Sequence, residues 1–271
     1  MDTTSSIILG IVQGLTEFLP VSSSGHLVLF QNLLGFKEPE LLLDCSLHLG
    51  TLLAVCIYLR HDLKSILMET MRFPKGFHKP RGTKMFLREN PHASLAIMVL
   101  VGTLPTLLIG LLFHSAIENL FGSVNWVGMM LVITGLILAI TKLIPEDYCR
   151  REKVVILVAL AIGAAQGLAL VPGISRSGTT IVCGLVCGLR RDLAARFSFL
   201  LAIPAIIGAT VVQLNAEAFV RVGLLSLTSG FVAAALVGLI ALKILMGMVR
   251  KGNLFWFAPY CCALGLFILF T

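Results

Sequence analysis

Long apolar stretches alternate with short polar connections along most of this chain. An apolar stretch of about 18 residues or more predicts a helix that crosses the roughly 30 Å hydrocarbon core of a membrane. The pattern predicts six such transmembrane helices. They cover residues 41–60, 94–113, 125–144, 193–213, 223–249 and 253–270.

Two further apolar regions are interrupted by a proline and a turn rich in serine or glycine. The first predicts helices over residues 7–19 and 22–34, and the second predicts helices over 154–170 and 175–189. A helix such as 7–19 reaches only about 20 Å, because an α-helix rises about 1.5 Å per residue. We therefore expect two re-entrant helical hairpins within an all-α polytopic membrane fold.

The two interrupted regions match each other at an offset of 153 residues. Residues 10–26 read GIVQGLTEFLPVSSSGH, and residues 163–179 read GAAQGLALVPGISRSGT. Three transmembrane helices follow each hairpin, and an odd number inverts the second half relative to the first. We therefore predict a single membrane domain over 1–271. In it the halves 1–150 and 151–271 form an inverted-topology repeat, whose hairpin tips meet near the midplane.

Composition agrees with a membrane protein, since 57% of residues are hydrophobic, 13% are charged and the mean hydropathy is +0.96. The net charge of +7 does not indicate nucleic-acid binding, because the chain contains no binding module for nucleic acid. The seven cysteines form no CxxC pair and are expected to be packing residues. The N-terminus lacks the basic region and cleavage site of a signal peptide, so the first hairpin is expected to remain in the mature protein.

The distribution of basic residues predicts the orientation of the chain. With both termini outside, the outside connections contain only Lys37 and Arg221, whereas 16 basic residues lie inside. This asymmetry follows the positive-inside rule, and the basic stretch 60–92 is interpreted as a topological, lipid-facing connection. The 16 residues are Arg60, Lys64, Arg72, Lys75, Lys79, Arg81, Lys84, Arg88, Lys142, Arg150, Arg151, Lys153, Arg190, Arg191, Arg250 and Lys251.

Each helix break predicts an anion site. Unpaired backbone groups are costly inside a membrane unless a cavity or a partner satisfies them. Ser22 and Ser175 are suited to cap the restarted helices, although capping alone and a functional role both remain open for them. Two facing helix N-termini would bind a doubly negative group such as phosphate or diphosphate, and Arg176 adds a planar set of donors.

The first break also carries reactive groups. Gln13 and Glu17 lie four residues apart on one helix face, and Glu17 is a candidate general base or ligand of a divalent cation. Ser23 offers a nucleophilic hydroxyl, and His26 follows one helical turn later, where its imidazole could exchange a proton with Ser23.

Other polar residues in the apolar segments are interpreted as structural. Asp44 and His48, also four residues apart, are expected to form a structural pair. Arg196 is expected to extend its guanidinium toward the inner interface.

Three motifs carry a resemblance to a known family. The sequences GLTEFLPVSSSGH at 14–26, PGISRSG at 172–178 and FSFLLAIP at 197–204 resemble the signatures of bacterial undecaprenyl-diphosphate phosphatases, the bacitracin-resistance family. The resemblance covers nearly the whole chain. It implies a multi-pass enzyme of the bacterial inner membrane that hydrolyses undecaprenyl diphosphate to undecaprenyl phosphate and inorganic phosphate. The reaction recycles the lipid carrier of peptidoglycan synthesis on the outer face.

The resemblance also assigns roles to residues. It implies that Ser23 is the nucleophile and that His26 and Arg176 are catalytic, while attack by water or by His26 remains open. A divalent cation is implied, with Mg²⁺ expected and Ca²⁺ as the alternative, and Glu17 is its expected protein ligand. The family's acidic motif reads Gln13 then Glu17 here, so one candidate carboxylate is missing. The expected substrate-binding residues are Gln13, Ser22, Ser24, Gly25, Ser175, Ser177, Gly178 and Thr179.

A transporter is the main alternative function. Inverted repeats with broken helices are typical of alternating-access carriers, so the chain could flip a phosphorylated polyprenyl lipid. A hydroxyl, an imidazole and a carboxylate close together favour the enzyme, because a carrier needs only the anion site. A structural scaffold would not explain polar residues at both breaks, and the sequence leaves the formation of a homo-oligomer open.

Overall fold

The structure is a computed structural model that describes residues 3–36, 41–72, 82–120, 123–213 and 223–270. Within these residues the chain is helical, and no strand forms beyond an isolated bridge between Arg151 and Leu189. In the first half the helices are α1 (Thr3–Phe18), α2 (Ser23–Leu33), α3 (Leu41–Tyr58), α4 (Arg60–Met71), α6 (Gly82–Glu89), α7 (Pro91–Leu112), α8 (His114–Leu120), α9 (Val124–Ala139), η1 (Ile140–Leu143) and η2 (Glu146–Tyr148).

Among the described residues the second half has fewer helices than the first. They are α10 (Ile156–Leu168), α11 (Arg176–Val186), α12 (Arg191–Gln213), α14 (Leu224–Arg250), η3 (Asn253–Trp256) and α15 (Phe257–Phe270).

The described helices confirm an all-α polytopic membrane protein. Five of them are long and apolar enough to cross a membrane: Pro91–Leu112, Val124–Leu143, Arg191–Val211, Leu224–Arg250 and Asn253–Phe270. The pair Leu42–Tyr58 and Arg60–Met71 also passes this test, although the two helices meet at 75°. The count is therefore five, or six if the bent pair is one span, and the sequence predicts six.

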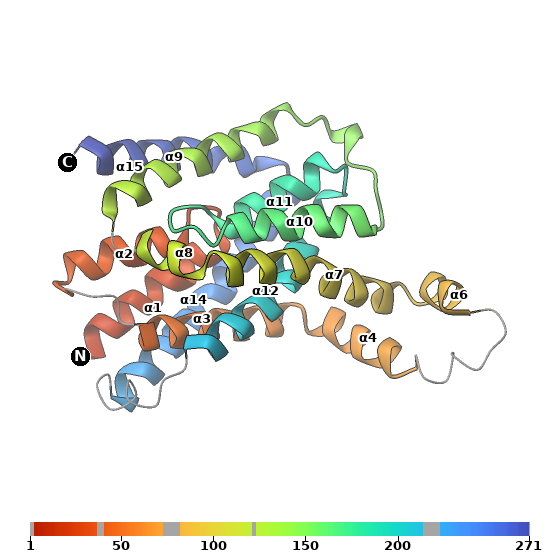
Figure 1. Cartoon of the computed structure of the whole chain (residues 1–271), viewed down its shortest axis with the longest axis horizontal. Coiled ribbons are helices and arrows are strands. Elements are labelled where there is room, and N and C mark those ends of the chain that lie inside the picture. The colour runs from red at the N-terminus through yellow and green to blue at the C-terminus, as the bar shows by residue number, and fades with distance from the viewer. Residues whose placement is uncertain (1–2, 37–40, 73–81, 121–122, 214–222, 271) are drawn as a thin grey trace.

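The two interrupted regions form helix pairs whose members are too short to span. The helices α1 and α2 have 16 and 11 residues, and α10 and α11 have 13 and 11. The α1–α2 pair opens toward the end of the molecule that holds both termini, whereas the α10–α11 pair opens toward the opposite end (Figure 1). The inverted repeat itself, its halves and their orientation across a membrane remain predictions.

The first helix of each hairpin packs against a long helix from the other half of the chain. Helix α1 lies along α14, and α10 lies along α7. The close approach needs glycine, because a Cβ at Gly10 would meet the backbone of Gly230 and a Cβ at Gly163 would meet the backbone of Gly102. Phe18 at the end of α1 is fully buried, and its ring packs edge-on against Phe199 of α12 at 5.7 Å. These contacts hold α1 and α10 close against the long helices beside them.

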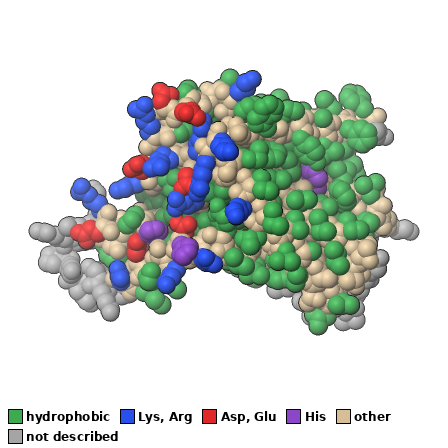
Figure 2. Space-filling view, turned by 180° about the vertical axis from the view of Figure 1, so that it is seen from behind, with side chains coloured by type: hydrophobic (Ala, Val, Ile, Leu, Met, Phe, Trp, Pro, Cys, Tyr) green, Lys and Arg blue, Asp and Glu red, His purple; other side chains and the backbone are tan. Residues whose placement is uncertain are grey.

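On the face seen in Figure 2, charged side chains gather at one end of the molecule, and hydrophobic side chains are spread over the rest. This end carries α4 and α6 within the basic stretch 60–92, a region for which the sequence predicts no helix. Arg196 lies in an ion network here, donating from Nε to Asp192 at 2.8 Å and from Nη1 to Asp62 of α4 at 3.2 Å. Five of the predicted loop cations lie outside the described residues: Lys37, Lys75, Lys79, Arg81 and Arg221.

All seven cysteines are free thiols in the structure. Cys45, Cys149 and Cys261 are buried and the others are half-buried. This agrees with the packing role expected from the sequence.

Candidate active site

The two hairpin tips meet inside the molecule. We call residues 17–24 the first tip and residues 169–176 the second tip. The second tip approaches the first through the backbone N–H of Gly173, which donates to Ser24 Oγ at 3.4 Å. An ion pair between Arg176 Nη2 and Glu17 Oε1 at 2.6 Å also joins them. The structure thus brings together groups that lie 159 residues apart in the sequence.

Glu17 is the centre of the site. It lies in the last turn of α1 and is only 6% exposed. Its Oε1 accepts from Arg176, and its Oε2 accepts from Ser23 Oγ at 2.6 Å and from Gln13 Nε2 at 3.0 Å. A carboxylate that accepts a short hydrogen bond from a hydroxyl is placed to take that hydroxyl's proton. The geometry therefore pairs Ser23 with Glu17.

His26 faces away from this proton transfer. Its Nδ1 lies 2.8 Å from the carbonyl oxygen of Ser22, and its Nε2 lies 2.7 Å from the phenol oxygen of Tyr260. The expected exchange of a proton between Ser23 and His26 is therefore not the arrangement found. His26 does follow Ser23 by one helical turn, but both of its ring nitrogens have other partners.

The tip serines cap the restarted helices in both hairpins. Ser22 Oγ accepts from the N–H of Gly25 at 3.3 Å, and Ser175 Oγ accepts from the N–H of Gly178 at 3.1 Å. Each cap also lies 3.3 Å from the hydroxyl two residues later, which is Ser24 in the first hairpin and Ser177 in the second. The geometry agrees with the prediction that these serines suit N-cap positions. In this arrangement the N-termini of α2 and α11 are directed at the site.

Several buried polar atoms at the site have no hydrogen-bond partner in the protein. Among the described residues these include Arg176 Nη1, Thr179 Oγ1 and Gln13 Oε1. Arg176 thus uses one arm of its guanidinium on Glu17 and keeps the other available. Buried polar groups are almost always paired, so such atoms point to a ligand that completes them.

His48 is a site residue that the sequence did not assign to this chemistry. Its Nε2 lies 3.8 Å from Glu17 Oε2 and about a third of its side chain is exposed. The expected pair with Asp44 exists, but His48 Nδ1 bonds to the Asp44 backbone carbonyl at 2.7 Å. The Asp44 carboxylate instead accepts from Gln31 Nε2 at 2.7 Å. The four-residue spacing signalled a pair, but it could not show that His48 turns toward Glu17.

The donor set for a divalent cation is small. No group of three or more His, Cys, Asp or Glu side chains that could hold a metal occurs in the part of the chain described here. Glu17 is the only carboxylate that the contacts above place at the tips, and both of its oxygens already accept hydrogen bonds. Mg²⁺ is commonly bound by one or two carboxylates together with substrate phosphates and water. The residues therefore fit a cation only if substrate supplies most of the ligands.

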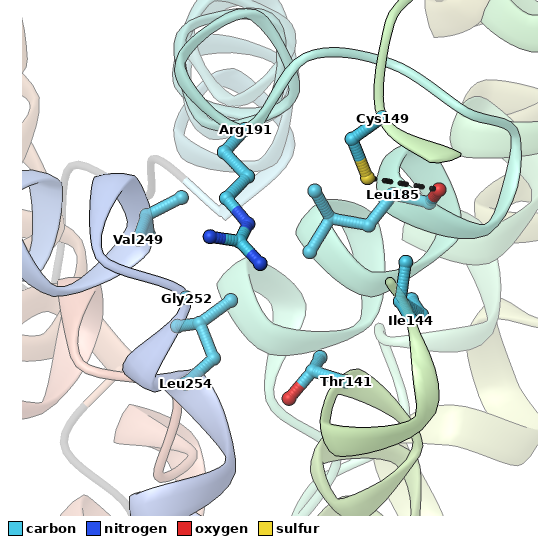
Figure 3. A pocket seen from close by; sticks show the side chains of 8 residues that line it. All are labelled: Thr141, Ile144, Cys149, Leu185, Arg191, Val249, Gly252 and Leu254. Atoms are coloured by element: carbon cyan, nitrogen blue, oxygen red, sulfur yellow. Dashed lines mark hydrogen bonds between the residues drawn. The ribbon is translucent and has the colours of Figure 1, made fainter. Parts of the chain in front are cut away.

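A small cavity at the charged end does not belong to this site. It has a volume of about 10 Å³ and is lined by residues from η1, α11, α12 and α14 and from the turns beside them, including Arg191 and Leu185 (Figure 3). The guanidinium of Arg191 lies beside Gly252 there and donates to Glu146 at 2.9 Å. The space suits about one water molecule, which is too little for a diphosphate.

Comparisons with known proteins agree over the full length of the chain. The family model "Bacitracin resistance protein BacA" matches residues 6–267. A curated protein from Desulfatibacillum aliphaticivorans named "Undecaprenyl-diphosphatase" is 44% identical over 97% of this chain and 96% of its own length. Proteins of the same name from Carboxydothermus hydrogenoformans and Methanosphaera stadtmanae are 42% and 40% identical, covering 99% and 98% of this chain and 97% and 96% of their own lengths. The chain therefore belongs to the bacitracin resistance protein BacA family.

Proposed function

We propose that this protein hydrolyses undecaprenyl diphosphate to undecaprenyl phosphate and inorganic phosphate. The observation that carries the proposal is the hydrogen bond from Ser23 Oγ to Glu17 Oε2 at 2.6 Å, beside an Arg176 guanidinium with one arm unpartnered. The relatives' name agrees with this activity. Such a reaction recycles the lipid carrier of peptidoglycan synthesis and underlies resistance to bacitracin.

Substrate would enter with its diphosphate between the two tips and its prenyl chain in the surrounding lipid. Arg176 Nη1, the Thr179 hydroxyl and the N-termini of α2 and α11 supply donors for the phosphate oxygens. These groups neutralise the charge that spreads over the transferring phosphoryl group.

Phosphoryl transfer then follows from the geometry around Glu17. Ser23 Oγ attacks the terminal phosphorus while its proton passes to Glu17 Oε2, and the bond to the bridging oxygen breaks to release undecaprenyl phosphate. Water attacks the phosphorus of the resulting phosphoserine, the bond from Ser23 Oγ to phosphorus breaks, and Glu17 returns its proton to Ser23 as inorganic phosphate leaves. Direct attack by water remains an alternative. Attack by His26 is disfavoured because both of its ring nitrogens are engaged.

A divalent cation is part of this proposal, with Mg²⁺ first and Ca²⁺ as the alternative. Glu17 would be its protein ligand and the substrate phosphates would complete its coordination. Such a cation supplies further neutralisation of phosphate charge.

We also propose an orientation in the membrane. The basic end faces the cytoplasm, both termini lie outside, and substrate reaches the site from the outer face. The clustering of charge at one end supports this orientation, and both termini lie at the other end (Figures 1 and 2). With an impermeant thiol reagent on intact cells, a cysteine introduced at Thr3 should react and one at Glu152 should not. The reverse pattern would contradict the proposal, and the unmodified protein provides the blank for native thiols.

The alternative function is lipid transport, favoured by two broken helix pairs that meet inside the molecule. Phosphate release from undecaprenyl diphosphate by the purified protein, with and without a chelator, separates the two. The proposed enzyme releases phosphate and loses that activity with the chelator. A protein that moves the lipid between leaflets of a vesicle but releases no phosphate is a transporter.

A further inference from the structure

His26 and Tyr260 form a contact that takes no part in the proposed proton transfer. Tyr260 lies on α15, and its phenol oxygen is 2.7 Å from His26 Nε2. The two rings are nearly parallel, with 12° between their planes and 5.9 Å between their centroids. The histidine is buried, whereas the tyrosine is 48% exposed. A hydrogen bond this short between distant segments fixes the position of the imidazole ring.

The direction of these hydrogen bonds follows from the partners. The Ser22 carbonyl oxygen can only accept, so Nδ1 of His26 carries a hydrogen and donates to it. In the neutral ring Nε2 is then the acceptor, and the Tyr260 hydroxyl is the donor. A continuous chain of hydrogen bonds therefore runs from α15 through His26 to the backbone of the first tip.

The residue at the end of this chain has an unusual backbone conformation. Ser22 has φ +68° and ψ +94°, and it is the one non-glycine residue with positive φ among the described residues. Such a conformation costs about 1–3 kcal/mol and persists only when its surroundings hold it. Ser22 directly precedes Ser23, so its backbone angles set the direction of the Ser23 hydroxyl.

Helix α15 contacts the same turn at a second point. The thiol of Cys261, the residue after Tyr260, donates to the backbone carbonyl of Pro20 at 3.5 Å. Two adjacent residues of α15 thus reach both sides of the first tip, one directly and one through His26.

We propose that Tyr260 is a positioning residue that acts through His26. It holds the imidazole against the Ser22 carbonyl, and this contact keeps the Ser23 hydroxyl directed at Glu17. The inference rests on the proposed hydrolysis at this site. Without the phenol hydroxyl the imidazole can turn, Ser23 spends less time at Glu17, and turnover falls while the groups that bind diphosphate stay in place.

The test is the pair of variants Tyr260→Phe and Tyr148→Phe in the full-length protein. Tyr148 also donates a phenolic hydrogen bond, to the Val186 carbonyl at 2.8 Å, but it lies outside the site. Tyr260→Phe should lower kcat about tenfold, the effect of losing roughly one hydrogen bond, with KM within about twofold of the parent. Tyr148→Phe should keep the parent kcat.

Nitrogen-15 NMR of the histidine side chains provides a second readout. The His26 signals, assigned by their loss in His26→Ala, should shift in Tyr260→Phe and stay in place in Tyr148→Phe. An unchanged kcat in Tyr260→Phe, a change confined to KM, or unshifted His26 signals would each overturn the proposal. A parent protein that releases no phosphate would contradict the hydrolysis instead, and the His26 spectrum would still test the contact.

Discussion

The two tips share one sequence pattern and one capping arrangement, yet their backbones differ. Ser22 and Ser175 each accept a hydrogen bond from the glycine N–H three residues later. Ser175 does so with φ −75°, an ordinary value, whereas Ser22 does so with φ +68°. In the second tip the positive φ falls on a glycine, Gly173 at +94°, where it costs little. The strain is therefore confined to the tip that carries Ser23.

The two tips also differ in the helix whose hydrogen bonds hold them in place. A hydroxyl on α9 holds the second tip: Thr134 Oγ1 donates to the Gly173 carbonyl and accepts from the Ser175 N–H, both at 3.0 Å. Helix α15 holds the first tip through Tyr260 and Cys261. At the offset of 153 residues Arg176 stands where the first tip has Ser23. One tip thus presents a nucleophile from a strained turn, and the other presents a cation from a relaxed one.

Of the changes that test this difference between the tips, loss of the nucleophile should lower phosphate release most. Ser23→Ala should lower phosphate release by at least about 10³-fold, because among the described residues no other hydroxyl donates to Glu17 Oε2. Ser229→Ala on α14, where the hydroxyl donates to Ser226, is the matched control and should be fully active. The parent enzyme should also yield a trapped phosphoserine. Substantial turnover in a well-folded Ser23→Ala protein would mean that water or His26 attacks phosphorus, and the hydrolase assignment would survive.

Loss of the cation at the second tip should come next. Arg176→Ala should lower kcat/KM by at least about 10²-fold, the scale of losing one donor to the transition state. Arg176→Lys should recover little, because an ammonium group cannot reach Glu17 and a phosphate oxygen with a rigid fork. Arg190→Ala removes an exposed ion pair with Glu152 and should leave activity intact. Near-normal turnover in Arg176→Ala would remove this residue from the site.

Much of this site follows from local sequence patterns, and the remainder depends on tertiary contacts. The positions of proline and serine predict both helix breaks and both caps. The repeat predicts that Glu17 and Arg176 approach each other. The partner of His26 could not be predicted, because Tyr260 is 234 residues away and lies in an apolar helix with no motif. Helix α4 and its bend of 75° from α3 could not be predicted either, because the apolar pattern ends near residue 60 and the basic stretch that follows is typical of a connection.

The support of the second tip should matter for stability and binding more than for turnover. Thr134→Val keeps the shape of the side chain but leaves the buried Ser175 N–H and Gly173 carbonyl unpaired. We expect a loss of about 2 kcal/mol in stability and a higher KM, with kcat changed less. Thr103→Val removes only a hydrogen bond within α7 and serves as the control. A fall in kcat as large as that in Tyr260→Phe, with KM unchanged, would show that the two supports are equivalent.

The smallest expected effect is on the melting temperature when glycine replaces each cap serine in turn. Glycine replaces an N-cap serine at a cost of a few tenths of a kcal/mol, and its flexibility in the unfolded chain adds roughly 0.5–1 kcal/mol. At Ser175 nothing offsets these costs, so Ser175→Gly should lower the melting temperature slightly. At Ser22 the same costs oppose the release of about 1–3 kcal/mol of backbone strain, so Ser22→Gly should leave the melting temperature equal or raise it by a few degrees. Thermal unfolding of both variants in one detergent measures the difference directly. Equal losses at the two positions would show that the Ser22 turn stores no strain and needs no support from α15.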